Sequence, residues 1–223
     1  MSNTSPNFIT SSIGKKFLMG FTGLFLISFL VIHVLINACI YFNDGGATFN
    51  MAASFMAHNI IIRIVEVGLF LGIILHVVQA LIITLQNNKA RPQKYAVQNL
   101  AVSSKWYSRS MGLLGTLLLM FLVVHLANFW VPTKIAVFKG EEHNTFESLK
   151  TVFSNPIVLA VYLLGLISLF YHLLHGFQSA FQTFGLNHKK YTPCIKSFGF
   201  WYSVIIVLLF ASMPITLFMG LIK

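Results

Sequence analysis

The chain has 223 residues, of which 57% are hydrophobic and only 9% are charged, and its mean hydropathy is +0.79. This composition excludes a soluble globular domain and predicts an integral membrane protein. The formal charge of +10 does not indicate a nucleic-acid-binding protein, because the basic residues lie in short segments between apolar runs.

A helix needs an apolar run of roughly 20 residues to cross a bilayer. Five runs meet this requirement, so the expected fold class is all-α: a bundle of five transmembrane helices in a single domain, 1–223. The expected helices are 17–42, 60–85, 110–131, 156–184 and 198–222. The first run is too long for a signal-peptide core and has no convincing cleavage site, so we expect it to be retained.

The distribution of basic residues predicts the orientation of the bundle. Ten lie on the side of the N-terminus: Lys15, Lys16, Lys89, Arg91, Lys94, Lys105, Arg109, Lys189, Lys190 and Lys196. The other side has four, Lys134, Lys139, Lys150 and Lys223, together with the acidic Asp44, Glu141, Glu142 and Glu147. Cytoplasmic loops carry the excess of lysine and arginine, so we expect the N-terminus inside and the C-terminus outside.

The first expected helix, 17–42, follows a candidate cap, Ser11 and Ser12, and carries His33 near its outer end. The second, 60–85, begins with Arg63 and Glu66, which are three residues apart and can share a face. We expect these two charges to pair, or one of them to serve a bound ligand.

Further along the second helix, Gly68, Gly72, His76 and Ala80 recur every four residues and form one stripe. The loop 86–109 contains Pro92, which breaks the helix, and the interfacial aromatics Trp106 and Tyr107. The third expected helix carries His125 near its outer end, and Pro132 follows it.

The fourth expected helix repeats the stripe as Ser168, His172, Gly176 and Ala180. Small residues at this spacing also allow close approach of two helices, which is the structural explanation of each stripe taken alone. The fifth helix has no histidine; Pro214 is expected to kink it, and its simplest role is to close the bundle.

The four intramembrane histidines fall at two depths. At about 1.5 Å per residue, His33 and His125 are level near the outer face, and His76 and His172 are level in the inner half. One such histidine is most simply a hydrogen-bonding contact between helices. Four that pair by depth predict instead two haem groups with two axial imidazoles each, held by coordination alone because neither Cys39 nor Cys194 belongs to a Cys-x-x-Cys-His attachment sequence. Two levels also argue against a single tetrahedral zinc site.

The remaining histidines are weaker ligand candidates. His175 competes with His172, but its face lacks the small-residue stripe, so we expect it to be a neighbour that could bond a propionate or quinone. His58, His143 and His188 lie at membrane edges or in loops and are not expected to be ligands.

With these motifs the sequence resembles the diheme cytochrome b subunit that anchors succinate dehydrogenase or fumarate reductase in the membrane. The segment Tyr171-His172-x-x-x-Gly176 resembles the family's haem motif, and Leu75-His76 with Ala80 is similar, with alanine in place of the usual glycine. Ile32-His33-x-x-x-Asn37 and Val124-His125-Leu126 resemble the other two ligand segments.

The resemblance implies a complex in which a flavoprotein subunit oxidises succinate, an iron-sulfur subunit relays electrons, and this chain passes them through two haems b to a quinone. The implied ligand pairs are His76 with His172 and His33 with His125. Membrane lipid is a further partner, a higher oligomer is left open, and the implied location is the bacterial cytoplasmic (inner) membrane.

Diheme members use low-potential quinones, which implies menaquinone. The residues before His172, Leu169 to Tyr171, include no glutamate such as the one that serves proton transfer in some fumarate reductases, and this departure favours succinate oxidation. Candidate quinone-site residues are Glu66, Arg63, His58 and Asn59.

Three alternatives remain open from the sequence. The chain could be the cytochrome b of a fumarate reductase, or that of another respiratory enzyme such as a hydrogenase or formate dehydrogenase. It could also be a transporter or structural membrane protein whose histidines serve packing, although no internal repeat is evident.

Overall fold

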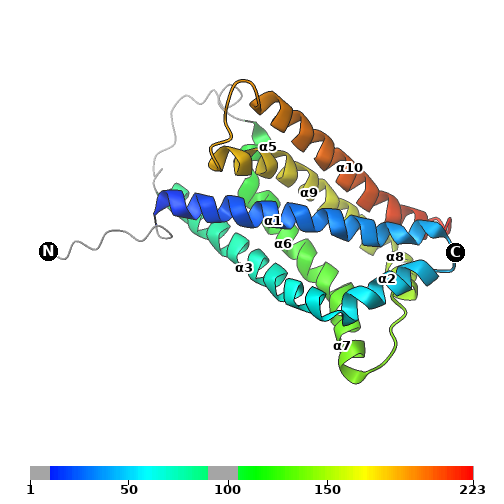
Figure 1. The fold of residues 1–223 in the computed structure, drawn as a ribbon. Coiled ribbons are helices and arrows are strands. Elements are labelled where there is room, and N and C mark those ends of the chain that lie inside the picture. Colours follow the sequence, from blue (N-terminus) through cyan, green and yellow to red (C-terminus); the bar gives the residue numbers. More distant parts are fainter. Residues whose placement is uncertain (1–10, 90–104, 223) are drawn as a thin grey trace.

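The computed structural model describes residues 11–89 and 105–222, and Figure 1 shows their helices running side by side. The all-α fold is confirmed for this part of the chain, in which every regular element is helical. By length and composition, five segments can cross a membrane: Ile13–Phe42, Ile60–Asn87, Met111–Lys139, Pro156–Thr183 and Thr192–Phe218. Pro92 and three of the basic residues used for the orientation, Arg91, Lys94 and Lys223, lie outside the described residues, and the orientation stays a prediction. We call the end at which α1 begins the inner end, and the opposite end the outer end.

Helix α1, Ser12–Ala38, is capped by Ser11, one of the two candidate caps, whose side chain accepts a 3.0 Å hydrogen bond from the backbone nitrogen of Gly14. The helix therefore begins five residues before the expected span. A 3-10 turn, Cys39–Phe42, finishes the span. The lysines at 15 and 16 thus lie in the first helical turns.

Between the first two expected helices, 17–42 and 60–85, no helix was expected, but residues Ala47–His58 form a helix, α2. Asp44 precedes it and accepts hydrogen bonds from the backbone and the hydroxyl of Thr48, which hold the pKa of the Asp44 carboxyl below its usual value. Helix α3, Ile60–Lys89, follows after one residue, Asn59, whose side chain accepts from the backbone nitrogens of Ile61 and Ile62.

The third span is longer than expected. A short helix α5, Trp106–Arg109, leads into α6, Met111–His125, which continues through a π-helical turn, Leu126–Trp130, into α7, Val131–Lys139. The expected end near residue 131 is therefore wrong, because Pro132 occupies the first turn of α7, where a proline is tolerated.

The outer segment before the fourth span also contains a helix, α8, Thr145–Phe153, capped by Asn144. Helix α9, Pro156–Thr183, is capped by Asn155 and begins with Pro156 as expected. Helix α10, Thr192–Phe218, starts six residues before the predicted boundary and contains Pro214 in its interior.

The spans α1, α3, α6 and α9 form a closed ring, because α1 contacts α3, α3 contacts α6, α6 contacts α9 and α9 contacts α1. Helix α10 packs outside this ring against α9 and α1, and Tyr202 on α10 donates a 2.6 Å hydrogen bond to the carbonyl oxygen of Ile27 on α1. The ring defines an interior to which four different helices contribute side chains.

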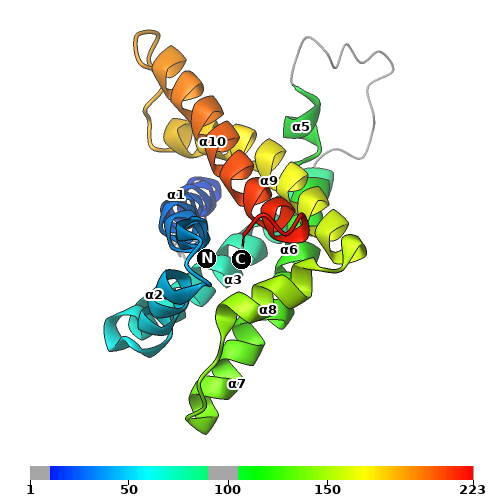
Figure 2. The ribbon, with the colours of Figure 1, turned by 90° about the vertical axis from the view of Figure 1, so that its right-hand side faces the viewer.

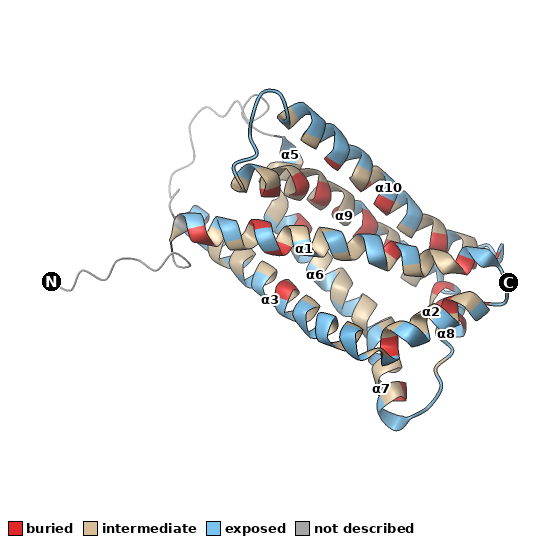
Figure 3. Ribbon diagram, viewed as in Figure 1, coloured by how far each residue is buried: buried red, intermediate tan, exposed pale blue. Residues whose placement is uncertain are grey.

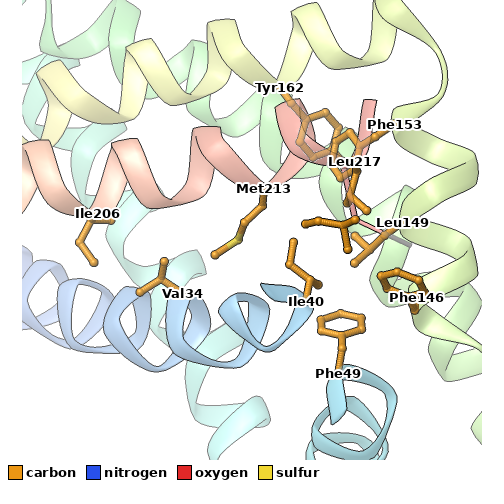
Figure 4. Packing of buried hydrophobic residues seen from close by; sticks show 11 residues of the cluster. Val34, Ile40, Phe49, Phe146, Leu149, Phe153, Tyr162, Ile206, Met213 and Leu217 are labelled. Atoms are coloured by element: carbon orange, nitrogen blue, oxygen red, sulfur yellow. The ribbon is translucent and has the colours of Figure 1, made fainter. Parts of the chain in front are cut away.

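The buried apolar core lies at the outer end (Figure 4). Figure 2, seen from that end, shows α2 and α8 lying across the ends of the spans. The cluster takes its residues from these two helices and from α1, α9, α10 and the chain end: Val34, Ile40, Phe49, Phe146, Leu149, Phe153, Tyr162, Ile206, Met213, Leu217 and Ile222. Elsewhere much of the surface of the spans is exposed (Figure 3). It carries many large apolar side chains, as lipid-facing helices require.

Candidate functional site: two histidine pairs within a four-helix ring

The inner pair joins His76 on α3 to His172 on α9. Their ring centres lie 6.2 Å apart, with 64° between the ring planes. Glycines of the other two ring helices lie against this pair: a Cβ built on Gly23 of α1 would meet Cε1 of His76 at 3.5 Å, and one on Gly115 of α6 would meet Cε1 of His172 at 4.0 Å. All four helices of the ring therefore surround the inner imidazoles.

The outer pair joins His33 on α1 to His125 on α6, with ring centres 5.8 Å apart and planes at 89°. Phe29 stacks on His33 at 5.2 Å, and Phe121 stacks on His125 at 5.7 Å. The phenol ring of Tyr162, from α9, lies 6.0 Å from His125. The outer pair is thus enclosed mainly by aromatic rings, in contrast to the glycines around the inner pair.

The two pairs lie at different levels of the bundle. Gly23 and His33 are ten residues apart on α1, and Gly115 and His125 are ten residues apart on α6, so each helix separates the levels by about 15 Å. The described residues contain no group of three or more histidine, cysteine or acidic side chains that could hold one metal ion. The donor set therefore consists of pairs of imidazoles.

The geometry of each pair fits a haem with two axial imidazoles. An imidazole–metal bond is about 2 Å long, so ligands on opposite sides of one iron have ring centres roughly 6 Å apart. The observed separations of 5.8 and 6.2 Å match this value. Within the described residues, Nδ1 of His125 and Nδ1 of His172 are also buried without a hydrogen-bond partner, so no protein contact fixes the tautomer of either imidazole.

The small-residue stripes divide into close contacts and open positions. Gly72 lies against Phe25 of α1, because a Cβ there would be 3.1 Å from the ring, which is the helix-packing role of a small residue. A Cβ built on Gly68 or on Gly176 would meet no atom within 4 Å. Gly176 is half-buried and lies one turn from His172, so its side of α9 offers free space beside the inner pair.

The expected pairing of Arg63 with Glu66 is wrong. Glu66 instead accepts hydrogen bonds from two residues of the third span: Lys134 donates to Oε2 at 2.6 Å, and the indole nitrogen of Trp130 donates to Oε1. The π-helical turn before α7 brings these donors to α3. Glu66 is thereby fixed at the outer end, near the level of His33 and His125.

The other candidate quinone-site residues lie at the start of α3 and the end of α2. Asn59 is engaged in capping α3, and Nδ1 of His58 lies 2.9 Å from the carbonyl oxygen of Ser54 in its own helix. A hollow of about 280 Å³ at the outer end is lined by different residues: Asn128, Glu147, Ser148, Thr151 and Val152. The structure therefore does not gather the four candidates around this hollow.

Two of the remaining histidines, His143 and His188, form hydrogen bonds with groups outside both pairs. Nε2 of His143 is 3.2 Å from the hydroxyl of Ser148, and Nδ1 of His188 accepts from the backbone nitrogen of Lys190. His175, half-buried on α9 three residues after His172, is close enough to His172 to interact with it electrostatically, and no hydrogen bond joins it to another described residue.

Sequence reasoning missed several residues that contact the pairs. Thr22 lies 3.1 Å from Nδ1 of His76, and Gly23 and Gly115 approach the inner rings. One signal was available: a glycine stands ten residues before both His33 and His125, at the level of the inner pair. Nothing in the sequence alone indicates that Tyr162 packs on His125, because that contact depends on how α6 and α9 pack.

Comparisons with known proteins agree with the resemblance stated above. The sequence is 28% identical over 160 residues to the succinate dehydrogenase cytochrome b558 subunit of Bacillus subtilis (strain 168), a match that covers 71% of this chain and 73% of that protein. No family model matches the sequence, and no solved structure gives a significant match. The similarity supports the resemblance to the cytochrome b membrane anchor of succinate dehydrogenase.

Proposed function

We propose, from this resemblance and from the paired histidines, that the chain is the membrane anchor and diheme cytochrome b of a succinate:quinone oxidoreductase in a bacterial cytoplasmic membrane. In this role a flavoprotein subunit passes electrons to an iron-sulfur subunit, and this chain carries them from the iron-sulfur subunit to a quinone. The succinate chemistry resides on those other subunits.

The observation that carries the proposal is the presence of two imidazole pairs at two levels inside one ring of helices. Ring-centre separations of 5.8 and 6.2 Å suit axial ligation, and a spacing of about 15 Å between levels places one pair near each end of the bundle. A protein that used its histidines only as contacts between helices would not require this arrangement.

The residues of the chain hold and enclose the two groups. His76 and His172 would hold the inner haem b, and His33 and His125 the outer one. Bound haem supplies reversible one-electron oxidation and reduction. Around the outer pair, Phe29 and Phe121 stack on the imidazoles, restrict their rotation and exclude water.

The quinone site is assigned to the outer end, with menaquinone as the acceptor expected for diheme relatives. Glu66 is the strongest of the four candidates, because Lys134 and Trp130 fix its carboxylate near the level of the outer pair. Arg63, one helical turn closer to the outer end of α3, supplies a cation that could meet a quinone oxygen.

The soluble subunits are expected to dock at the inner end, where the basic residues gather. Succinate oxidation is favoured over fumarate reduction because Leu169, Phe170 and Tyr171 precede His172 and no glutamate stands among them. The basic inner end suits docking of the soluble subunits of either a succinate dehydrogenase or a fumarate reductase. Turnover measurements on the purified complex therefore decide whether it oxidises succinate or reduces fumarate.

Single histidine replacements in the purified complex test the proposal. His76→Ala or His172→Ala is expected to remove one of two b-type haems and retain the other, whereas His33→Ala or His125→Ala removes the second. His143→Ala, in the outer segment, serves as the matched control and should retain both. Reduced-minus-oxidised spectra and haem stoichiometry give the result, and retention of two haems in all four variants would contradict the ligand assignment.

Co-purification tests the rest of the proposal. Affinity capture of the tagged chain should recover a flavoprotein and an iron-sulfur protein with succinate-dependent quinone reduction. Recovery of hydrogenase or formate dehydrogenase subunits instead would assign the cytochrome to a different respiratory enzyme.

A further inference from the structure

A hydroxyl on α1 contacts one of the two inner histidines. Oγ1 of Thr22 lies 3.1 Å from Nδ1 of His76, and Thr22 is only 3% exposed. The same oxygen lies 2.9 Å from the carbonyl oxygen of Leu18 and 3.1 Å from that of Met19. The hydroxyl therefore has two acceptors on its own helix and one imidazole nitrogen on α3.

The direction of the Thr22–His76 hydrogen bond depends on where the single hydroxyl proton of Thr22 points. Carbonyl oxygens can only accept, and a hydroxyl has one proton to donate. When that proton serves the carbonyl of Leu18 or Met19, as the 2.9 and 3.1 Å contacts favour, Nδ1 of His76 donates to Thr22. A neutral imidazole with its proton on Nδ1 has a free lone pair on Nε2, the nitrogen that can then bind a metal.

We propose that Thr22 is a positioning residue that holds His76 in the Nδ1-protonated tautomer and presents its Nε2 to the inner haem iron. This inference rests on the proposed function, and it adds a residue outside the four ligands that sets the properties of one haem. Hydrogen bonds of this kind fix the tautomer and ring orientation of metal-binding histidines and raise the basicity of the ligating nitrogen.

The other three histidines lack such an acceptor among the described residues. Nδ1 of His172 and Nδ1 of His125 have no hydrogen-bond partner. Nδ1 of His33 lies 3.4 Å from the amide nitrogen of Asn37, which is a donor because it bonds the His33 carbonyl oxygen at 2.8 Å. Among the four paired histidines, His76 is therefore the one whose Nδ1 has such an acceptor among the described residues.

The hydrogen bond has a defined effect on the inner haem. A more basic axial nitrogen stabilises the oxidised iron more than the reduced iron, so Thr22 lowers the midpoint potential of the inner haem and strengthens its binding. Loss of such a partner weakens metal binding by about 10- to 100-fold. The outer haem, about 15 Å away along α1, should not respond.

Replacement of the hydroxyl in the full complex tests the inference. Thr22→Val keeps the shape of the side chain and removes the hydrogen bond, whereas Thr22→Ser keeps the hydroxyl. Thr216→Val is the matched control, because Thr216 on α10 donates to the carbonyls of Ser212 and Met213 in the same way, and no hydrogen bond joins it to a described histidine. Potentiometric titration and haem stoichiometry are measured for each variant, and the haem that His76→Ala removes identifies the inner transition.

The expected result is a higher midpoint potential and reduced retention of the inner haem in Thr22→Val, with Thr22→Ser and Thr216→Val like the wild type. If Thr22→Val does not accumulate, Thr22→Ala removes the same hydroxyl without adding a methyl group in its place. Wild-type potentials and haem content in the hydroxyl-free variant would overturn the inference, as would equal shifts in Thr22→Val and Thr22→Ser. A wild-type complex without any haem would instead overturn the proposed function, and the inference with it.

Discussion

The substitution Gly165→Ala should disturb the outer histidine pair indirectly, through Phe121. A Cβ on this α9 glycine would lie 2.5 Å from Cδ2 and 2.6 Å from Cγ of Phe121 on α6. Carbon atoms in contact settle at about 3.5 Å, so the Phe121 ring must move by about 1 Å. Phe121 stacks on His125 at 5.7 Å and 27°, and the displacement is therefore passed to a proposed haem ligand.

The expected cost in stability is modest. Overpacking of a filled contact costs about 1–3 kcal/mol, while replacing a helical glycine by alanine returns about 1 kcal/mol. The net loss of up to about 2 kcal/mol should leave the protein folded. The effect on haem should be larger, with affinity at the outer site reduced by about 10-fold, the lower end for changes one step from a metal ligand.

A second glycine provides a control of matched severity. A Cβ on Gly199 of α10 would lie 2.6 Å from Cδ1 of Phe177, a ring that contacts other aromatic side chains but none of the paired histidines. Thermal unfolding in detergent should show similar destabilisation for Gly165→Ala and Gly199→Ala, whereas difference spectra should show loss of the outer haem only in Gly165→Ala. Equal haem content in the two variants would refute the argument that Phe121 positions His125.

Two further substitutions probe the inner pair and the outer carboxylate. A side chain at Gly176 would meet no protein atom within 4 Å, so protein packing alone predicts little effect of Gly176→Leu, whereas the haem proposal predicts loss of the inner haem by difference spectroscopy; an unchanged inner haem would place it elsewhere. Lys134→Met should leave Glu66 with Trp130 as its one remaining donor and lower the free energy of unfolding by about 1–2 kcal/mol, measured by thermal unfolding. This is less than the full value of a charge-assisted hydrogen bond, because the side chains of Lys134 and Glu66 are 24% and 21% exposed. The substitution should also raise the quinone KM in the purified complex, and an unaltered KM would argue against a quinone role for Glu66.

The spans could be predicted from the sequence because the length and hydropathy of a membrane helix are local properties. Their ends were predicted less closely, because a helix can extend beyond its apolar run: α10 begins at Thr192, six residues before the expected boundary. The depths of His33 and His125 followed from helical rise alone, which is why the sequence could suggest the pairs before any contact was known.

The two outer helices α2 and α8 were missed because they exist through contacts between distant segments. Phe49 of α2 and Phe146 of α8 are almost completely buried in the outer core. Asn50 donates to the side chain of Asn144 and accepts from the backbone of Phe146, which joins the two helices directly. Each segment alone is too short and too polar to show its helix by hydropathy.

The partner of Glu66 was missed because the third helix was expected to end at residue 131, before Lys134. Instead, the backbone nitrogen of Val131 bonds the carbonyl of Leu126 five residues back, and this wider turn accommodates Pro132, which has no N–H to donate. The extra residue in the turn also rotates everything beyond it by about 100° relative to α6.

That rotation connects the two functional regions at the outer end. His125, on the last turn of α6, faces His33 across the ring, whereas Trp130, the last residue of the π-helical turn, and Lys134, beyond it on α7, reach Glu66 on α3. With a regular α-helix in place of this turn, the donors would lie about one residue further around the helix and away from the carboxylate. The π-helical turn thus allows one helix both to donate an imidazole to the ring interior and to fix the proposed quinone-site carboxylate beside it.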